Sequence, residues 1–363
     1  MILNYCKQFL IVLFFLSYSV QAHTGLFSKE KVERKIHKEF TVKTDATLEV
    51  DNSFGDVNIV TWDKNQIQID VTIRVRGRNQ KKIDERLESI SIQFQNNPER
   101  VSAQTQIEEL WQWSWFQISY QQTDFEIDYE IKMPHTNNLE ISNDYGSIFL
   151  DEIDGNTAIN CDYGKVILGE LRGLENTLTF DYTANSSIDF IKKGTIRADY
   201  SGFELGRAEQ ITLAADYTSS KIERVEILEF NTDYGKLSVS EGGIISGKGD
   251  YITLRFGNIQ QELDIETDYG SIRVAQILPS AQRIIVDSEY TTVRLGVHPK
   301  WDFNFDVDLD YAGFQTELPL YYQKEIREDT EKLYQGYHHN ASSENILKVT
   351  AEYGNLKIIN PTY

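Results

Sequence analysis

An acidic residue followed by tyrosine recurs eleven times between Asp144 and Tyr353. Carboxylates in a row could coordinate Ca²⁺, which prefers oxygen ligands, but no fixed oxygen-rich loop accompanies these acids. Aspartate also ends strands by accepting a nearby backbone N–H. We therefore predict no metal and no other cofactor, and we expect the pairs to be structural corners. Their tyrosines are Tyr145, Tyr163, Tyr182, Tyr200, Tyr217, Tyr234, Tyr251, Tyr269, Tyr290, Tyr311 and Tyr353.

A second pattern is a column of cations, with Arg255, Arg273 and Arg294 each four residues after a tyrosine. Stacked cations repel one another, so this column suits an anionic partner such as a uronic or phosphorylated glycan. The alternative is pairing with acids of neighbouring repeats, such as Glu266 or Asp287. The three arginines are candidate ligand-binding residues.

A third pattern is a stripe of indoles in "ELWQWSWFQ", where Trp111, Trp113 and Trp115 alternate. In an extended strand they share one face. We expect them mainly to seal the end of the hydrophobic core, with one ring at the rim available for binding. The alternative is an exposed platform for sugar rings or another envelope protein.

Groups that could catalyse a reaction are scarce. The sequence has no G-x-S-x-G, H-E-x-x-H or C-x-x-C motif, so we predict no catalytic residues. His338 and His339 could ligate a metal, but adjacent histidines in a polar segment are expected simply to be exposed.

The elements that position these residues follow from the spacing. Successive tyrosines lie 17 to 21 residues apart, with a last step of 42. The residue four before the tyrosine is apolar in ten of eleven copies, and those three and five after it are each apolar in nine. Because side chains alternate along a strand, this change from even to odd offsets requires a corner. The period predicts an all-β fold, a parallel solenoid whose strands pair with the repeats above and below.

At each corner we expect the tyrosine on the buried side, stacked on the next tyrosine at about 4.8 Å. The acid should face water and accept the N–H of the residue two positions later. That residue is Gly, Ala, Ser or Thr in ten of eleven copies, as suits a corner that needs small or conformationally permissive residues.

The rest of the chain divides into three parts. Residues 1–22 are typical of a secretory signal peptide, so we expect an exported protein in the periplasm, associated with the outer membrane, or secreted. Residues 23–135 predict a strand-rich cap with one helix near residues 81–90, and with Phe54 in the place of a first corner tyrosine. Residues 136–363 predict the solenoid, with a loop or hairpin inserted at about 315–345.

Composition excludes several classes of protein. The formal net charge of −20 disfavours binding to nucleic acid or anionic membrane. No second apolar run has the length of a transmembrane segment. Only Cys161 follows the signal peptide, so no intrachain disulfide is expected.

The segments "FGDVNIVTWDKNQIQIDVTIRVRG", the strand ending at Met133–Pro134 and the reiterated "DYG", "DYT" and "DYS" resemble the bacterial putative adhesin family. The resemblance implies a right-handed, single-stranded parallel β-helix and transfers no catalytic residues. We expect an exported binding or structural module of the cell envelope that contacts glycan or protein, and not an enzyme. The alternatives are a polysaccharide-active β-helix enzyme and a periplasmic signalling partner.

Overall fold

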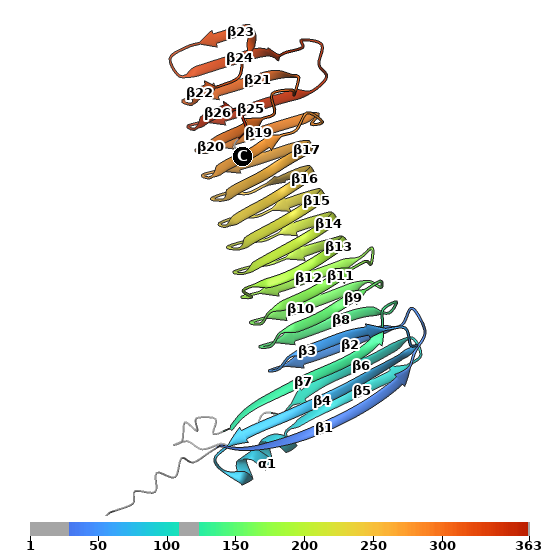
Figure 1. The fold of residues 1–363 in the computed structure, drawn as a ribbon. Helices are drawn as coiled ribbons and strands as arrows, with labels where there is room; N and C mark the ends of the chain where they lie inside the picture. Colours follow the sequence, from blue (N-terminus) through green and yellow to red (C-terminus); the bar gives the residue numbers. More distant parts are fainter. Residues whose placement is uncertain (1–28, 109–122, 362–363) are drawn as a thin grey trace, which may run out of the picture.

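The computed structural model describes residues 29–108 and 123–361. In these residues the chain forms 26 strands, which make one sheet, and a single helix. Figure 1 shows the strands stacked one above another into an elongated body, with β1 and α1 at one end and β23 at the other. The predicted all-β class is confirmed.

Strands that run into the acid–tyrosine corners pair with one another, and we call this set, together with the strands that extend it at either end, the incoming ladder. Its central pairs are parallel and in register, whereas β5–β6, β21–β24 and β23–β24 are antiparallel. In spatial order it contains β5 (Ile90–Asn97), β6 (Arg100–Ile107), β2 (Thr47–Ser53), β8 (Asn138–Asp144), β10 (Thr157–Asp162), β12 (Asn176–Asp181), the second halves of β13 (Ser186–Arg197), β14 (Gly202–Ala214), β15 (Ser219–Asn231), β16 (Lys236–Lys248) and β17 (Thr253–Asp268), then β19 (Arg283–Glu289), β25 (Ile346–Glu352), β21 (Phe303–Asp310), β24 (Glu331–His338) and β23 (Tyr321–Arg327).

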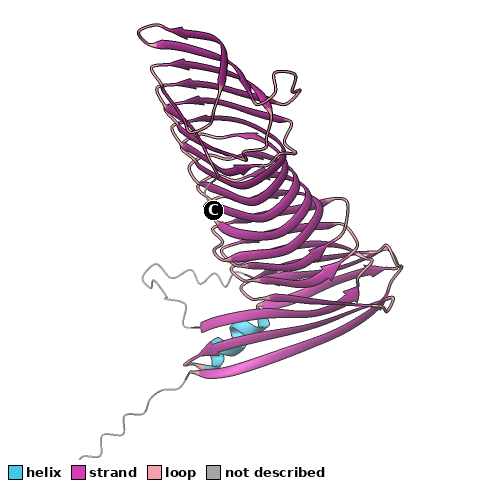
Figure 2. Ribbon diagram, turned by 45° about the horizontal axis from the view of Figure 1, so that its top comes forward, coloured by secondary structure: helices cyan, strands magenta, loops and turns pink. Residues whose placement is uncertain are grey.

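Strands that leave the corners form the outgoing ladder, which further strands extend at the N-terminal end. Its first two pairs are antiparallel and the others are parallel. In spatial order it contains β1 (Glu30–Thr41), β4 (Gln66–Gly77), β7 (Thr123–Pro134), β3 (Val57–Trp62), β9 (Ile148–Ile153), β11 (Val166–Leu171), the first halves of β13 to β17, β18 (Ser271–Ile277), β20 (Thr292–Val297), β26 (Asn355–Ile359) and β22 (Gly313–Thr316). β13 to β17 therefore run through both ladders, and Figure 2 shows the strands of the stack bending midway.

The hydrophobic columns expected from the spacing lie in register. Ile141, Ile159 and Leu178, each four residues before a tyrosine, are ladder partners in successive repeats. They are buried. Ile148 and Val166, which lie three residues after Tyr145 and Tyr163, are buried as well. Both ladders therefore contribute alternate side chains to one core, which is why the pattern has period two on each side of the corner.

The corner itself differs from the prediction. All eleven tyrosines and Phe54 have positive φ, between 45° and 64°. A residue in this left-handed conformation is not extended, so it breaks the alternation of faces and directs its side chain outward. The tyrosines are 46% to 59% exposed. Our assignment of the tyrosine to the buried side is therefore wrong. The last buried residue of each incoming strand lies two positions before the tyrosine, as Cys161 and Phe180 do.

The small residue after the tyrosine has a steric purpose. No described glycine has positive φ, so conformational permissiveness is not what this position needs. A Cβ on Gly164 would lie 1.9 Å from the carbonyl oxygen of Gly146 in the preceding repeat. Gly146 itself meets the carbonyl oxygen of Gly55 at 1.8 Å in the same way. Glycine is therefore required at these two corners, because consecutive backbones approach closely there.

The spatial order of the last repeats differs from their order in the sequence. β25 pairs with β19 on one side and with β21 on the other, and β26 lies likewise between β20 and β22. The C-terminal segment is thus inserted between two repeats that precede it in the chain. The end is instead covered by the antiparallel hairpin β23–β24, which lies within the segment that we expected to be an inserted loop or hairpin.

The N-terminal end is covered by the antiparallel strands β1, β4 and β7. The expected helix is confirmed as α1 (Gln80–Glu88), which Asn79 caps by accepting the backbone N–H of Lys82. Ile83 is buried where α1 packs against β4. β2 and β3 form a first repeat around Phe54, as predicted.

Candidate functional site

The main surface feature is a continuous row of rings that we call the aromatic ladder. Successive ring centroids lie 4.8 to 5.2 Å apart with interplanar angles of 1° to 10°, so the predicted stacking is confirmed. Because the C-terminal segment is inserted, Tyr353 stacks between Tyr290 and Tyr311. In spatial order the rings are Phe54, Tyr145, Tyr163, Tyr182, Tyr200, Tyr217, Tyr234, Tyr251, Tyr269, Tyr290, Tyr353 and Tyr311.

The stacking determines what this surface presents to a partner. Each ring inside the ladder has neighbours on both faces, so ring edges and phenol hydroxyls face the solvent. Tyrosine combines apolar area with a polar tip and is enriched at interfaces. The aromatic ladder can therefore contact a partner along its length through hydrogen bonds and ring edges.

The acids before the tyrosines form a second row, the acid ladder. We expected these carboxylates to accept the backbone N–H of the residue two positions later, but they do not. Asp233 Oδ1 instead accepts the backbone N–H of Asp250 at 2.7 Å, and five neighbouring pairs repeat this bond at 2.9 to 3.3 Å. In return the N–H of Tyr234 donates to the carbonyl oxygen of Asp250 at 3.0 Å. The corner is thus held to its neighbour and not only to itself.

Crowding in these rows shifts their ionisation. Glu289 has a raised pKa mainly because the charge of Asp268 lies beside it. Loss of hydration, followed by the charges of neighbouring acids, raises the pKa of Asp144 and Asp181. Loss of hydration and neighbouring phenols raise the pKa of Tyr234, so its hydroxyl stays protonated at neutral pH.

The predicted column of cations is present and is longer than the sequence suggests. Arg255, Arg273 and Arg294 are ladder partners on β17, β18 and β20. The next partner of Arg294 is Lys357 on the inserted β26. We call these four residues the basic ladder. Lys357 also stands four residues after its tyrosine, but the sequence alone does not place it beside Arg294.

The alternative partners of the arginines lie elsewhere. Glu266 and Asp287 are in the incoming ladder, where they pair with each other, whereas the arginines are in the outgoing ladder. Within residues 29–108 and 123–361, neither Arg255 nor Arg294 forms an ion pair, and Nε of Arg294 is buried without a hydrogen-bond partner. Lys357 lies 3.7 Å from Glu317.

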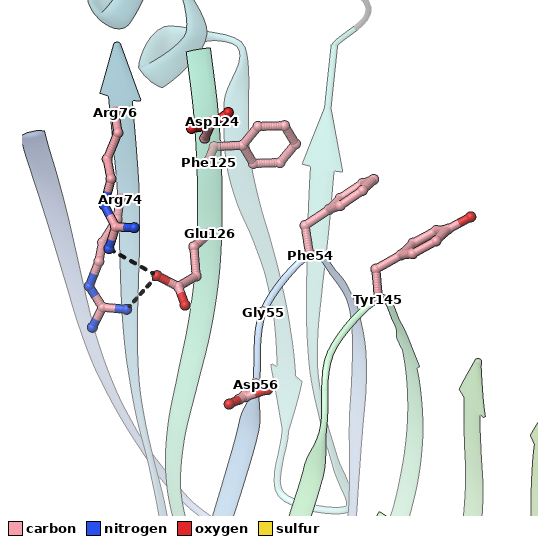
Figure 3. A pocket seen from close by; sticks show the side chains of 9 residues that line it. All are labelled: Phe54, Gly55, Asp56, Arg74, Arg76, Asp124, Phe125, Glu126 and Tyr145. Atoms are coloured by element: carbon pink, nitrogen blue, oxygen red, sulfur yellow. Dashed lines mark hydrogen bonds and ion pairs between the residues drawn. The ribbon is translucent and has the colours of Figure 1, made fainter. Parts of the chain in front are cut away.

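A cleft of about 360 Å³ lies at the Phe54 end of the aromatic ladder. Figure 3 shows Phe54, Phe125 and Tyr145 on one side of it and Arg74, Arg76 and Glu126 on the other. Glu126 lies 3.3 Å from Arg74 and 3.8 Å from Arg76. Arg74 and Arg76 are therefore already engaged by a carboxylate within the cleft, which Asp56 and Asp124 also line.

Two further groups were singled out in the sequence, the alternating tryptophans and the adjacent histidines. Trp111, Trp113 and Trp115 lie outside the described residues. His338 is buried, not exposed as expected, because its ring lies against Phe303 and its Nδ1 is 2.8 Å from the carbonyl oxygen of Trp301. Burial lowers the His338 pKa. Among the described residues no three His, Cys, Asp or Glu side chains are grouped so as to hold a metal ion.

Sequence families do not extend these observations, since no family model and no curated protein matches the chain. Within the described residues, no helix has the length and hydropathy needed to cross a bilayer.

Several solved structures are similar to the chain, among them the following three. A putative adhesin from Parabacteroides merdae is 8% identical over 90% of this chain and 96% of that one, with a TM-score of 0.35. A putative adhesin from Parabacteroides distasonis is 8% identical over 90% and 97%, with a TM-score of 0.30. A putative cell adhesion protein from Clostridium sporogenes is 12% identical over 91% and 100%, with a TM-score of 0.19. Similarity at this level identifies no partner for this chain.

Proposed function

We propose that the chain is an exported binding or structural module of the cell envelope, and that it contacts glycan or protein along the aromatic ladder. The observation that carries the proposal is the row of twelve rings, each 41% to 59% exposed, on one edge of the stack. Exposed apolar surface of this extent and continuity is unusual on a protein without a partner.

The module is proposed to bind and not to catalyse. Its surface groups recur in every repeat, as those of an extended contact surface do, whereas a catalytic group is needed once. The cleft beside Phe54 supports the same reading, because Arg74 and Arg76 are engaged by Glu126.

We also propose that the incoming and outgoing ladders are the two faces of a right-handed parallel β-solenoid. In-register parallel pairing between repeats supports this, as in Ile159 with Leu178 and Leu150 with Leu168. Each outgoing strand then connects two parallel strands of the incoming ladder, and such crossovers are right-handed in nearly all proteins.

The test of function uses the chain from residue 23 on, immobilised and exposed to outer-membrane vesicles, peptidoglycan sacculi and purified envelope glycans. The variant replaces Tyr200, Tyr217 and Tyr234 by Ser. The matched control replaces Tyr321 and Tyr322 by Ser, because these tyrosines are exposed on β23 outside the aromatic ladder. We expect the first variant alone to lose binding, with both variants remaining folded by circular dichroism. Equal binding by the ladder variant, or no binding by the wild type, would contradict the proposal.

A further inference from the structure

Four strands form the ends of the two ladders, and β5 differs from the other three. Proteins protect such edge strands with charged residues, bulges or short length, because unpaired backbone groups otherwise pair with another chain. β1 has a charged residue at seven of its twelve positions, and β22 has only four residues. β23 has three charged residues and an irregular register between Tyr322 and Lys324. β5, with the sequence ISIQFQNN, has eight residues, no charge and a regular register with β6.

The hydrogen bonds of β5 show which of its backbone groups are unpaired. Among residues 29–108 and 123–361, β6 is the only strand that pairs with β5. The N–H of Glu108 donates to the carbonyl oxygen of Ser89, so the odd-numbered residues of β5 exchange hydrogen bonds with β6. The backbone groups of the even-numbered residues therefore point to the free edge.

This free edge is short and symmetrical. Arg34 of β1 already donates to the carbonyl oxygen of Ile90, and Pro98 just beyond β5 has no N–H to donate. Between these limits the edge presents the N–H and C=O groups of three residues at alternate positions. They are Ile92, Phe94 and Asn96.

We propose that this edge pairs with the same edge of a second copy of the chain, antiparallel and about a two-fold axis that passes beside Phe94. In this register Phe94 pairs with Phe94 of the partner subunit, and Ile92 pairs with Asn96 of the partner subunit. All the N–H and C=O groups of the free edge then have partners, as an isologous contact requires. The inference goes beyond the proposed function, because it does not depend on what the aromatic ladder contacts.

The side chains on the outer face of β5 fit this register. Gln93 and Gln95 are exposed, and each lies opposite the other across the two-fold axis. A glutamine amide both donates and accepts hydrogen bonds, so two such pairs satisfy each other without any change of charge. The outer face therefore contributes hydrogen bonds between the two copies.

The side chains on the inner face leave apolar surface that a second copy would cover. Ile92 and Phe94 are only partly buried, although they pack against the core. On the facing strand β1 the same is true of Val32, Ile36 and Phe40, and the rings of Phe40 and Phe94 lie 6.2 Å apart. Core packing is thus incomplete at the N-terminal end, where Figure 1 shows β1 and β5.

The absence of charge on β5 suits a second copy in particular. Two copies of a protein with a formal net charge of −20 repel each other, so self-association is opposed least where no charges meet. The register places no like charges opposite each other within the paired strands. Strand pairing of this length is small beside the roughly 1,200–2,000 Å² buried in stable complexes, so we expect a reversible dimer.

The test is sedimentation velocity of the chain from residue 23 on, over a series of concentrations from micromolar to millimolar. The first variant is Gln93→Lys with Gln95→Lys, which places lysine opposite lysine twice across the axis. The matched control is Gln93→Lys with Gln95→Glu, which places lysine opposite glutamate twice. Both variants change the same exposed positions, and circular dichroism would check that both are folded.

We expect the wild type to dimerise reversibly as its concentration rises. The first variant should raise the dimer dissociation constant by about tenfold or more, because like charges are directly opposed. The control should stay within about threefold of the wild type. Equal weakening by the two variants would overturn the inference. A protein that stays monomeric would overturn it as well, since the edge would then be unpaired or covered within one chain. Open polymers in place of dimers would contradict the two-fold axis.

A cross-link tests the register independently. Residues directly opposite at a pair without backbone hydrogen bonds have Cα atoms about 4.5 Å apart, within the reach of a disulfide. A mixture of the single variants Gln93→Cys and Gln95→Cys should therefore form disulfide-linked dimers under mild oxidation, and Gln93→Cys alone should form far fewer. Cys161 is buried and does not compete. Equal cross-linking by Gln93→Cys alone would overturn the proposed pairing.

Discussion

Asp233 accepts a hydrogen bond from the backbone N–H of Asp250, 17 residues later in the chain, at 2.7 Å. One side chain thus fixes the position of the equivalent acid in the next repeat. The rings that follow these acids, Tyr234 and Tyr251, stack at 4.9 Å as a consequence. The corners therefore fix the register between successive repeats, in addition to turning the chain within each repeat.

The first prediction concerns the cost of removing a ring. Tyr234→Ala should lower the free energy of unfolding by about 1–3 kcal/mol, because two ring contacts are lost from a half-exposed site. Tyr234→Gly should be less harmful than Tyr234→Ala by about 1 kcal/mol, since φ is 51° there and glycine adopts this conformation freely. Thermal and urea unfolding would measure both. If Ala proved the milder change, backbone strain would not operate at the corner.

The second prediction tests the close approach of backbones. Gly164→Ala should destabilise the protein by about 1–3 kcal/mol or more, because its Cβ would overlap the carbonyl oxygen of Gly146. Gly202→Ala is the matched control, since the atom nearest to its new Cβ is 4.0 Å away. The melting temperatures of the two variants should differ clearly. Similar melting temperatures would contradict the steric explanation of the corner glycines.

The third prediction tests the insertion of the C-terminal segment. Asp287 and Thr350 are ladder partners, so cysteines in their places should form a disulfide under mild oxidation. Cysteines at Asp287 and Asp308 should not, because Thr350 lies between them and two strand spacings exceed the reach of a disulfide. Mass spectrometry after proteolysis would read the cross-link. A bond between positions 287 and 308 alone would place the repeats in sequence order instead.

The fourth prediction concerns pH. Since Asp268 raises the pKa of Glu289 in the folded protein, this group contributes stability below its ordinary value of 4.5 that is lost as pH rises through the folded pKa. Glu289→Gln should therefore raise the melting temperature at pH 7 and reduce the gain seen on mild acidification. Lys82 lowers the pKa of Glu85, so Glu85→Gln should lower the melting temperature at pH 7. Shifts of the same sign in both variants would contradict this account.

The sequence predicts the repeat and its core because burial acts directly on side-chain type. Ile159 and Leu178 recur in phase since both face the core. The change from even to odd offsets also shows that one residue near each corner is not extended. It does not show which one. Glycine was the natural candidate for a left-handed residue. In the structure the tyrosine has the positive φ, and the glycine after it is small because a carbonyl oxygen of the neighbouring repeat lies close to it.

The order of the last repeats could not be predicted for a related reason. Every repeat presents the same pattern of buried residues, so Val286 can accept either Val307 or Val349 as its partner in register. Only the step of 42 residues before Tyr353 hints at an irregular arrangement. The fourth member of the basic ladder, Lys357, was hidden by the same ambiguity.

The inserted β25 and β26 also bear on how the chain is made. Residues 346–359 are synthesised after both of the repeats between which they lie. The stack cannot be completed until translation reaches this segment, and until then β19 and β21 have unpaired edges or an interim pairing that must reopen. A chain terminated before residue 346 therefore leaves the edges of β19 and β21 without these partners, and unpaired strand edges can pair with other chains.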